Sequence, residues 1–204
     1  MNELIAKIEQ WAEDRNIIKG SKPIDQAMKL FSEFGELADN VGKGRDCRDD
    51  IGDVFVVLTI MCKQLNKPIR VTGVEYLTAT LQSGNTSPKS IVASLAVFLS
   101  SFVSSAEDGE SCDVGSILAS LINLSHYYSI CSFEECVTIA YNDIKDRKGL
   151  MHNGVFIKES DPAYVPVVAA IESNCTIDEG ALDNIEADKR MATQKRISVN
   201  LEDL

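Results

Sequence analysis

The sequence predicts an all-α protein. Apolar residues recur at helical spacing through most of the chain, and no run of convincing length alternates strictly between apolar and polar residues. The chain has 204 residues, of which 45% are hydrophobic and 25% charged, so it can bury a core without disulfide or metal staples. We therefore expect a soluble helical bundle.

The first two helices are expected to be amphipathic. One helix is expected over residues 3–17, and the glycine and proline within residues 19–23 end it. The second is expected over residues 25–41, and the glycines at 42 and 44 follow its end. Each has a single apolar face, which predicts that both helices cover the core from outside.

The third helix is expected at the centre of the core. It covers residues 48–66, is apolar on almost every side beyond Val54, and ends before Pro68. A helix that is apolar all round is buried on all sides. A shorter helix is expected over residues 74–81.

The pattern of the second and third helices then recurs. The apolar stripe of the second helix returns 65 residues later, and Asp50-Ile51-Gly52-Asp53-Val54 returns 63 residues later as Asp113-Val114-Gly115-Ser116-Ile117. We interpret this as two copies of a helix–loop–helix unit, at residues 21–82 and 87–149, forming a pseudo-dimer. Two unrelated amphipathic hairpins would give a similar pattern by coincidence.

Domain organisation follows from the repeat and from a change in composition. The two copies belong to one domain, expected at residues 1–161. Residues 162–204 carry many acids and few large apolar side chains, so we expect them to form a peripheral, acidic C-terminal tail.

Charge and cysteine usage exclude several classes of protein. The chain has 20 Lys and Arg against 31 Asp and Glu, and its net charge of −11 disfavours a nucleic-acid polymer as partner. Six cysteines without a CxxC pair, and two histidines, argue against a zinc site or a disulfide framework. No signal peptide and no continuous apolar span are visible, so we expect a cytoplasmic protein without a membrane partner.

Four carboxylates are spaced so that each pair shares one side of a helix. Glu33 and Glu36 are three residues apart on the second helix, and Asp50 and Asp53 are three apart at the start of the third. A hairpin of these helices would bring the two pairs together. Four hard oxygen ligands suit Mg²⁺, with Mn²⁺ as an alternative, commonly together with substrate phosphates.

Ordinary structural reasons also account for some of these acids. Asp50 lies in the first turn of a helix, where the helix dipole favours negative charge, and Glu33 and Glu36 could be solvated. Asp53 is harder to explain, because it shares a face with Val57 on a helix that is otherwise apolar, where a carboxylate needs a metal or a partner. The spacing by itself leaves both interpretations open.

Three short motifs occur in an order that is typical of one protein family. Glu33-Phe34-Gly35-Glu36, Asp50-Ile51-Gly52-Asp53 and Asp146-Arg147-Lys148-Gly149 resemble the MazG-like all-α nucleoside triphosphate pyrophosphohydrolases, in their compact phage and bacterial form. The similarity covers residues 3–66 and 133–161. The resemblance implies a hydrolase of nucleotide-pool control that uses Mg²⁺ to convert a (d)NTP to the monophosphate and pyrophosphate.

The resemblance also implies a role for each group of residues. The metal ligands would be Glu33, Glu36, Asp50 and Asp53. One of the two glutamates would orient the attacking water, and Lys145 and Arg147 on a basic exit helix, with Lys148, would neutralise the triphosphate. Further substrate contacts are expected from Trp11, Arg15, Gln26, Lys29 and Asn142, although Trp11 also fits a place in the core.

The chain departs from the family pattern in two ways. Asp50 stands where the family usually has glutamate, and residues 67–132 intervene where compact members continue directly. In the second copy, the places of Glu33, Glu36 and Asp53 are taken by Phe98, Ser101 and Ser116. We therefore expect one site per chain, in a monomeric pseudo-dimer or a homo-oligomer. The alternatives are a nucleotide-binding regulatory module with weakened catalysis and a structural helical adaptor.

Overall fold

The structure is a computed structural model that describes residues 1–71, 87–108, 114–127 and 132–173. Its contacts divide the chain into two compact units, Met1–Lys158 and Glu159–Leu204. The described residues are mainly helical, which confirms the all-α prediction at this coarse level. The boundary between the units falls close to the one expected after residue 161, and the chain beyond residue 173 lies outside the described residues.

The first expected helix is two helices, not one. α1 covers Asn2–Asp14, and the short α2 covers Ile17–Gly20. Between them Asn16 has a φ of 55°, in the left-handed region that a continuing helix does not adopt. The single helix predicted over residues 3–17 was therefore wrong in its last turn, because asparagine tolerates this conformation better than most residues.

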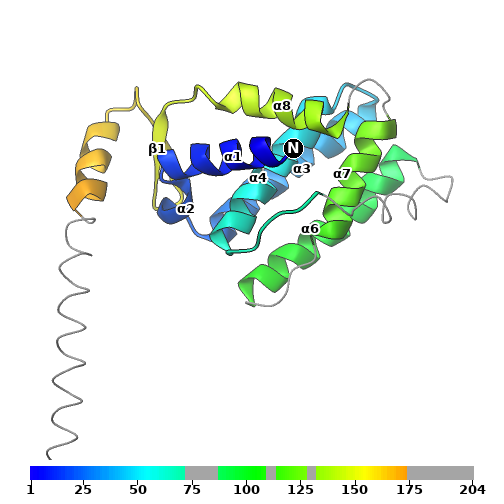
Figure 1. Cartoon of the computed structure of the whole chain (residues 1–204), viewed down its shortest axis with the longest axis horizontal. Helices are drawn as coiled ribbons and strands as arrows, with labels where there is room; N and C mark the ends of the chain where they lie inside the picture. Colours follow the sequence, from blue (N-terminus) through cyan, green and yellow to red (C-terminus); the bar gives the residue numbers. More distant parts are fainter. Residues whose placement is uncertain (72–86, 109–113, 128–131, 174–204) are drawn as a thin grey trace, which may run out of the picture. The chain divides into compact units, whose positions relative to one another are not determined.

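α3 and α4 form the hairpin that the sequence predicts. α3 covers Pro23–Lys43 and α4 covers Arg48–Gln64. Pro23 starts α3, where the missing N–H has no helical partner to lose, and Gly44 ends it with a φ of 66°. Almost every residue of α4 beyond Asp50 is buried, and α1, α3, α7 and α8 all pack on it (Figure 1). The central position of this helix is confirmed.

Three further helices follow among the described residues of the first unit. α6 covers Pro88–Glu107, α7 covers Gly115–Tyr127 and α8 covers Phe133–Ile144. α6 packs against both α7 and α3, whereas α8 runs along α4 (Figure 1). The duplication stays a prediction, and the helix expected over residues 74–81 lies outside the described residues.

α4 and α8 approach each other closely at Gly52. A Cβ atom at this position would lie 2.3 Å from the carbonyl oxygen of Cys136 and 2.7 Å from the Cβ of Ala140. One turn further on, Phe55 packs edge-to-face on Phe133, with ring centroids 5.2 Å apart. The two helices are thus antiparallel, and the polar start of α4 lies beside the end of α8.

A β-hairpin follows α8, which the sequence analysis missed. β1 covers Gly149–His152 and pairs antiparallel with β2, Val155–Lys158, with Leu150 opposite Ile157. The turn residues Asn153 and Gly154 both have positive φ, 49° and 79°, as a type I′ turn requires. Each strand has only four residues, too few for apolar alternation to stand out, but the Asn-Gly pair was a readable signal.

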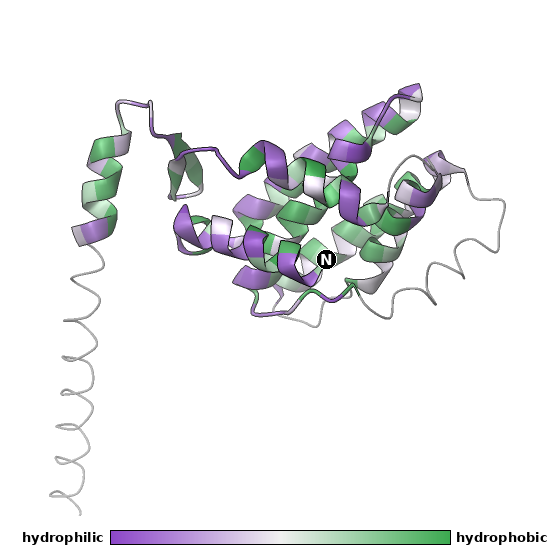
Figure 2. Cartoon of the chain, turned by 45° about the horizontal axis from the view of Figure 1, so that its top comes forward, coloured by the Kyte–Doolittle hydropathy of each residue, from purple (hydrophilic) through white to green (hydrophobic). Residues whose placement is uncertain are grey.

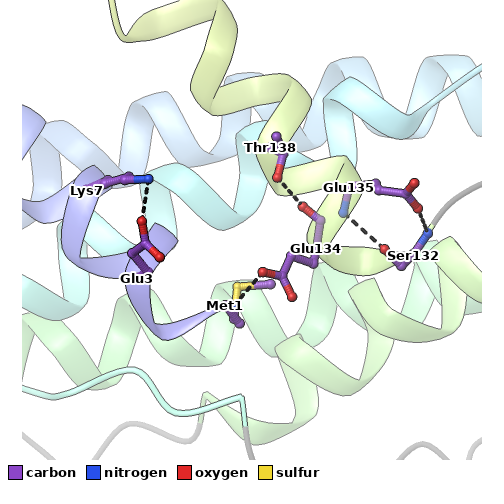
Figure 3. A network of polar contacts seen from close by, with 7 residues as sticks. All are labelled: Met1, Glu3, Lys7, Ser132, Glu134, Glu135 and Thr138. Carbon is purple, nitrogen blue, oxygen red and sulfur yellow. Dashed lines mark hydrogen bonds and ion pairs between the residues drawn. The ribbon is translucent and has the colours of Figure 1, made fainter.

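Polar contacts dock α1 along α8. The amino group of Met1 lies 2.6 Å from Oε1 of Glu134, near the start of α8 (Figure 3). At the other end of the pair, Nε1 of Trp11 donates to the carbonyl oxygen of Ile144 at 2.9 Å. These two contacts fix the end of α8 relative to α1.

Apolar residues concentrate on α4 and on the α6–α7 pair (Figure 2). Among the described residues, α6 is long and apolar enough to cross a membrane by length and composition alone, and 33% of its apolar 18-residue window is buried in the fold. Core helices of soluble proteins pass the same test, so this finding assigns no location. The described part of the second unit contains one helix, Tyr164–Ser173.

The close approach at Gly52 gives a stability prediction. Gly52→Ala must push α8 away from α4, and we expect a loss of about 1–3 kcal/mol from this overpacking. Gly35→Ala is the matched control, because its Cβ would meet nothing within 4 Å; there the better helix former should add about 0.5–1 kcal/mol. Urea unfolding measures both, and equal effects at the two positions would contradict the packing described here.

Candidate functional site

A pocket of about 640 Å³ opens where α1, α3 and α4 meet the end of α8 and the β-hairpin. One part of its wall is charged or polar, and the other is mainly apolar. The polar lining residues are Asp25, Gln26, Lys29, Glu33, Glu36, Asp49, Asp53 and Arg147. The remaining lining residues are Trp11, Ile17, Val56, Val57, Ile60, Ile144, Met151, Gly154 and Phe156.

α3 contributes the two glutamates predicted from the sequence. Glu33 is only 7% exposed, whereas Glu36, almost one turn further on, is exposed. The ammonium group of Lys29, one turn before Glu33, forms an ion pair with its carboxylate. Lys29 therefore lines the pocket with Glu33 as its partner, and its predicted contact with a substrate stays a prediction.

α4 contributes aspartates in a different arrangement from the predicted one. Asp53 lines the pocket together with Asp49, which the sequence analysis did not single out. Asp50 does not line it: its Oδ2 accepts a hydrogen bond of 2.8 Å from Nδ2 of Asn40. Asp50 still lies within electrostatic reach of Glu36 and Glu33, so it belongs to the rim of the acidic cluster.

Burial, together with nearby carboxylates, raises the pKa of the three aspartates at the start of α4. Burial raises the pKa of Asp53 to about 7, helped by the charges of Asp49 and Glu33 and opposed by Lys29 and Arg147. Burial also raises the pKa of Asp49, with Asp143 as the largest contributing charge, and the pKa of Asp50. Oδ1 of Asp49 is buried and has no hydrogen-bond partner among the described residues. A bound cation would relieve each of these features.

The pocket has the ligand types that a hard divalent cation prefers, but their present positions do not form a ready coordination site. Carboxylate oxygens are the ligands that Mg²⁺ prefers. Within the described parts of the chain, however, no three His, Cys, Asp or Glu side chains lie close enough together to hold a metal ion as they stand. Binding would require side chains to move. Lys29 would have to release Glu33, which the 54% exposure of the Lys29 side chain permits.

The predicted basic groups are separated. Arg147 lines the pocket, but it lies beyond the end of α8 rather than on a helix. Lys145 and Asn142 line a different hollow, between α1 and α8, where Nζ of Lys145 donates to Oδ1 of Asn142 at 2.9 Å. The prediction of one basic exit helix was wrong, because α8 ends at Ile144 and the chain then turns into the hairpin. Lys148 does not line the pocket either.

Arg15 positions this turn instead of lining the pocket. Its Nε donates to the carbonyl oxygen of Arg147 at 2.7 Å, and its Nη2 donates to that of Lys145 at 3.0 Å. The guanidinium lies over the ring of Trp11, 4.9 Å from its centroid. Arg15 thereby ties the backbone on both sides of Asp146 to α1, and Arg147 is placed at the pocket as a consequence.

Trp11 and Gln26 combine structural and lining roles. Trp11 is 9% exposed and bonded to the end of α8, so it belongs to the core, yet one of its sides lines the pocket. Gln26 is also buried, and its Nε2 donates to Oγ of Ser21 at 2.9 Å. Both line the pocket, and their predicted contacts with a substrate stay a prediction.

The β-hairpin supplies lining residues that the sequence analysis missed, Met151, Gly154 and Phe156. Backbone hydrogen bonds hold the hairpin against the segment between α1 and α3. The N–H of Met151 donates to Arg15 O at 2.8 Å, and the N–H of Gly154 donates to Gly20 O at 2.9 Å. A side chain at Gly154 would collide with the carboxyl group of Asp25.

Comparison with known proteins finds a phage relative. A protein of Haemophilus phage HP1, described as an uncharacterized 18.2 kDa protein in the rep-hol intergenic region, is 50% identical to this chain over 66 residues. The match covers 31% of this chain and 40% of that protein, so the chain spans well under half of its relative. No family model matches the chain, and no solved structure matches it.

The raised pKa of Asp53 predicts how stability depends on pH. The pKa of Asp53 is about 7 in the folded protein and 3.8 in the unfolded chain. Its stabilising contribution to folding is therefore fully present below pH 3.8 and is lost as the pH rises through 7. In EDTA, Asp53→Asn should therefore stabilise the protein at pH 8 by about 1–3 kcal/mol, a figure reduced for partial exposure, and by little at pH 4.

Thermal unfolding at the two pH values measures this difference. Asp46→Asn is the control, because Arg48 lowers the pKa of Asp46 and the substitution should not stabilise the protein at pH 8. A Tm of Asp53→Asn at or below that of the wild type at pH 8 would contradict the electrostatics described here.

Proposed function

We propose that this protein is a Mg²⁺-dependent nucleoside triphosphate pyrophosphohydrolase, which converts a (d)NTP and water to the (d)NMP and pyrophosphate. The observation that carries the proposal is the composition of one pocket. Five carboxylates from the adjacent helices α3 and α4, an arginine, and an apolar part with two aromatic residues all line it. These are the groups needed for a metal, a polyphosphate and a base.

The acidic part of the pocket supports binding of Mg²⁺, with Mn²⁺ as an alternative. The residues that would hold the ion, as the family resemblance implies, are Glu33, Glu36 and Asp53 in the pocket and Asp50 at its rim, with Asp49 as a fifth carboxylate ligand that the pocket adds. A bound divalent ion polarises the phosphoryl group and lowers the pKa of a bound water.

The side chains of the pocket suit the remaining chemical needs. Water attacks the α-phosphorus, the bond from this phosphorus to the bridging oxygen of the β-phosphate breaks, and pyrophosphate leaves with the electron pair. Glu36, exposed at the pocket wall, would orient the water and accept its proton. Arg147 would stabilise the negative charge that develops on the phosphates, which is the main catalytic requirement of phosphoryl transfer.

The apolar part supports binding of a base. Trp11 and Phe156 offer aromatic surface, and the amide of Gln26 offers a hydrogen-bonding edge. The phage relative bears a name that states no activity, so the proposal rests on the pocket and on the resemblance to MazG-like enzymes. Control of the nucleotide pool would be the biological purpose of such an activity in the cytoplasm.

The test is an assay with each common NTP and dNTP, in Mg²⁺ and in EDTA, with chromatographic resolution of the products. We expect monophosphate and pyrophosphate from at least one nucleotide in Mg²⁺, and none in EDTA. Asp53→Asn and Glu36→Gln should lower kcat by about 10²-fold or more, because each removes a group that acts on the reacting centre. Asp49→Asn tests the fifth carboxylate in the same assay.

Asp46→Asn is the control, since Asp46 is exposed and paired with Arg48 outside the pocket. Binding of a nucleotide in Mg²⁺ without turnover would favour the regulatory module instead. Absence of both turnover and binding across the panel would contradict the proposal.

The separation of Arg147 from Lys145 gives a second functional prediction. Arg147→Ala should lower kcat/KM by about 10²–10³-fold, because it removes the arginine of the pocket. Lys145→Ala should stay within a few-fold of the wild type, because Lys145 lies in the other hollow. Steady-state kinetics on the preferred nucleotide measure both, and a larger loss in Lys145→Ala would show that the triphosphate lies on the opposite side of α8.

A further inference from the structure

Three polar side chains beside the pocket form a hydrogen-bonded network. Gln26 is 5% exposed and lines the pocket, and its Nε2 lies 2.9 Å from Oγ of Ser21. Ser21 is also buried and directly follows α2. Gln64, the last residue of α4, completes the network through its own Nε2. This network decides which end of the Gln26 amide faces the pocket.

The hydroxyl group of Ser21 has no hydrogen-bonding capacity left. Its Oγ donates its single proton to the carbonyl oxygen of Ile17 at 2.8 Å. Nε2 of Gln64 lies 3.1 Å from the same Oγ and 3.0 Å from the carbonyl oxygen of Ser21, so its N–H groups point at acceptors. A hydroxyl oxygen accepts two hydrogen bonds, and it receives them from Gln64 and Gln26. Because Oγ has no second proton to donate, the end of the Gln26 amide that faces it is Nε2.

Oε1 of Gln26 therefore faces the pocket as a hydrogen-bond acceptor. Within the described part of the chain no group donates to this oxygen, and it is not shut off from solvent. Asp25, the preceding residue, adds a carboxylate acceptor to the same lining. The indole N–H of Trp11, another lining residue, already donates to the carbonyl oxygen of Ile144. These lining residues thus offer acceptors to a bound base.

Gln26 lies on the same face of α3 as the predicted metal ligands, two turns before Glu33. Seven residues separate the two, which is about 10 Å along a helix that rises 1.5 Å per residue. This spacing leaves room for a sugar and a phosphate between a base at Gln26 and a metal ion at Glu33. The amide is therefore placed to read the base.

We propose that Gln26 selects nucleotides whose base carries an exocyclic amino group, adenine or cytosine, by accepting a hydrogen bond from that group at Oε1. This specificity rests on the proposed function, in which the pocket holds a nucleotide. A carbonyl in place of the amino group, as in hypoxanthine and uracil, would set two acceptors against each other and leave both unpaired. Ser21 is then a positioning residue, because it holds the amide in the accepting orientation.

The experiment compares bases that differ in this one group. AMP and IMP, and CMP and UMP, are titrated calorimetrically into the full-length protein in Mg²⁺; such monophosphates are products of the proposed reaction and are not consumed. We expect at least about tenfold tighter binding of the amino member in one pair. The kcat/KM for ATP over ITP, or for CTP over UTP, should show the same preference. The pair that discriminates identifies the base as a purine or a pyrimidine.

Two substitutions test how the selection works. Gln26→Met removes the acceptor and keeps the side-chain length, so binding of the amino member should weaken about tenfold and the preference should disappear. Ser21→Ala frees the amide to turn either end to the pocket, so binding of the deaminated member should tighten, which a merely structural role would not cause. Gln10→Met is the control, because Gln10 is exposed and bonded to Asp14 outside the pocket, and it should leave the preference unchanged.

The outcomes separate this specificity from the proposed enzyme. Hydrolysis of triphosphates with equal binding within both pairs, or with tighter binding of IMP or UMP, would overturn the specificity alone. A preference that survives Gln26→Met would also overturn it and assign the selection to another group. A preference for the amino member without any hydrolysis would uphold the specificity and contradict the enzyme. Absence of both hydrolysis and binding would overturn both proposals.

Discussion

The burial of α4 on every side is the constraint on which the rest of the structure depends. Gly52 allows α8 to pack directly on its backbone, and the apolar residues from Val54 to Cys62 fill the centre of the core. This packing fixes the orientation of α4, so the polar residues of its first turn cannot rotate toward solvent. Hydrophobic packing holds Asp49 and Asp53 beside the glutamates of α3, and it stabilises an arrangement that electrostatic repulsion and burial disfavour.

The pocket is assembled from segments that are far apart in sequence. Contacts between residues 15–20 and residues 144–154 close one side of it, and they are mostly hydrogen bonds to backbone carbonyl groups. Such contacts fix positions without demanding particular side chains at the hairpin. The hydrogen bond from Arg15 to the backbone of Arg147 helps to place Arg147 in the pocket with the acids. Arg15, which was expected to contact substrate, therefore positions Arg147 instead.

The two halves of the helical unit carry different surfaces. α3 and α4 present carboxylates to a pocket, whereas α6, at the corresponding place in the predicted second copy, has Phe98 and Ser101 where α3 has Glu33 and Glu36. Between Lys89 and Glu107, α6 has no charged side chain. The predicted duplication is thus compatible with a single site per chain.

The sequence by itself determined the helices, the central place of α4 and the acidic character of the site, because periodicity and burial are encoded locally. It also contained the Asn153-Gly154 signal of the hairpin, which four-residue strands made easy to overlook. Only the tertiary structure decided that Asp49 lines the pocket while Asp50 is hydrogen-bonded to Asn40. It also decided that Arg147 and Lys145 line different hollows. A residue's neighbours across the fold depend on where its helix ends and how the chain turns afterwards, and spacing along one helix does not contain that information.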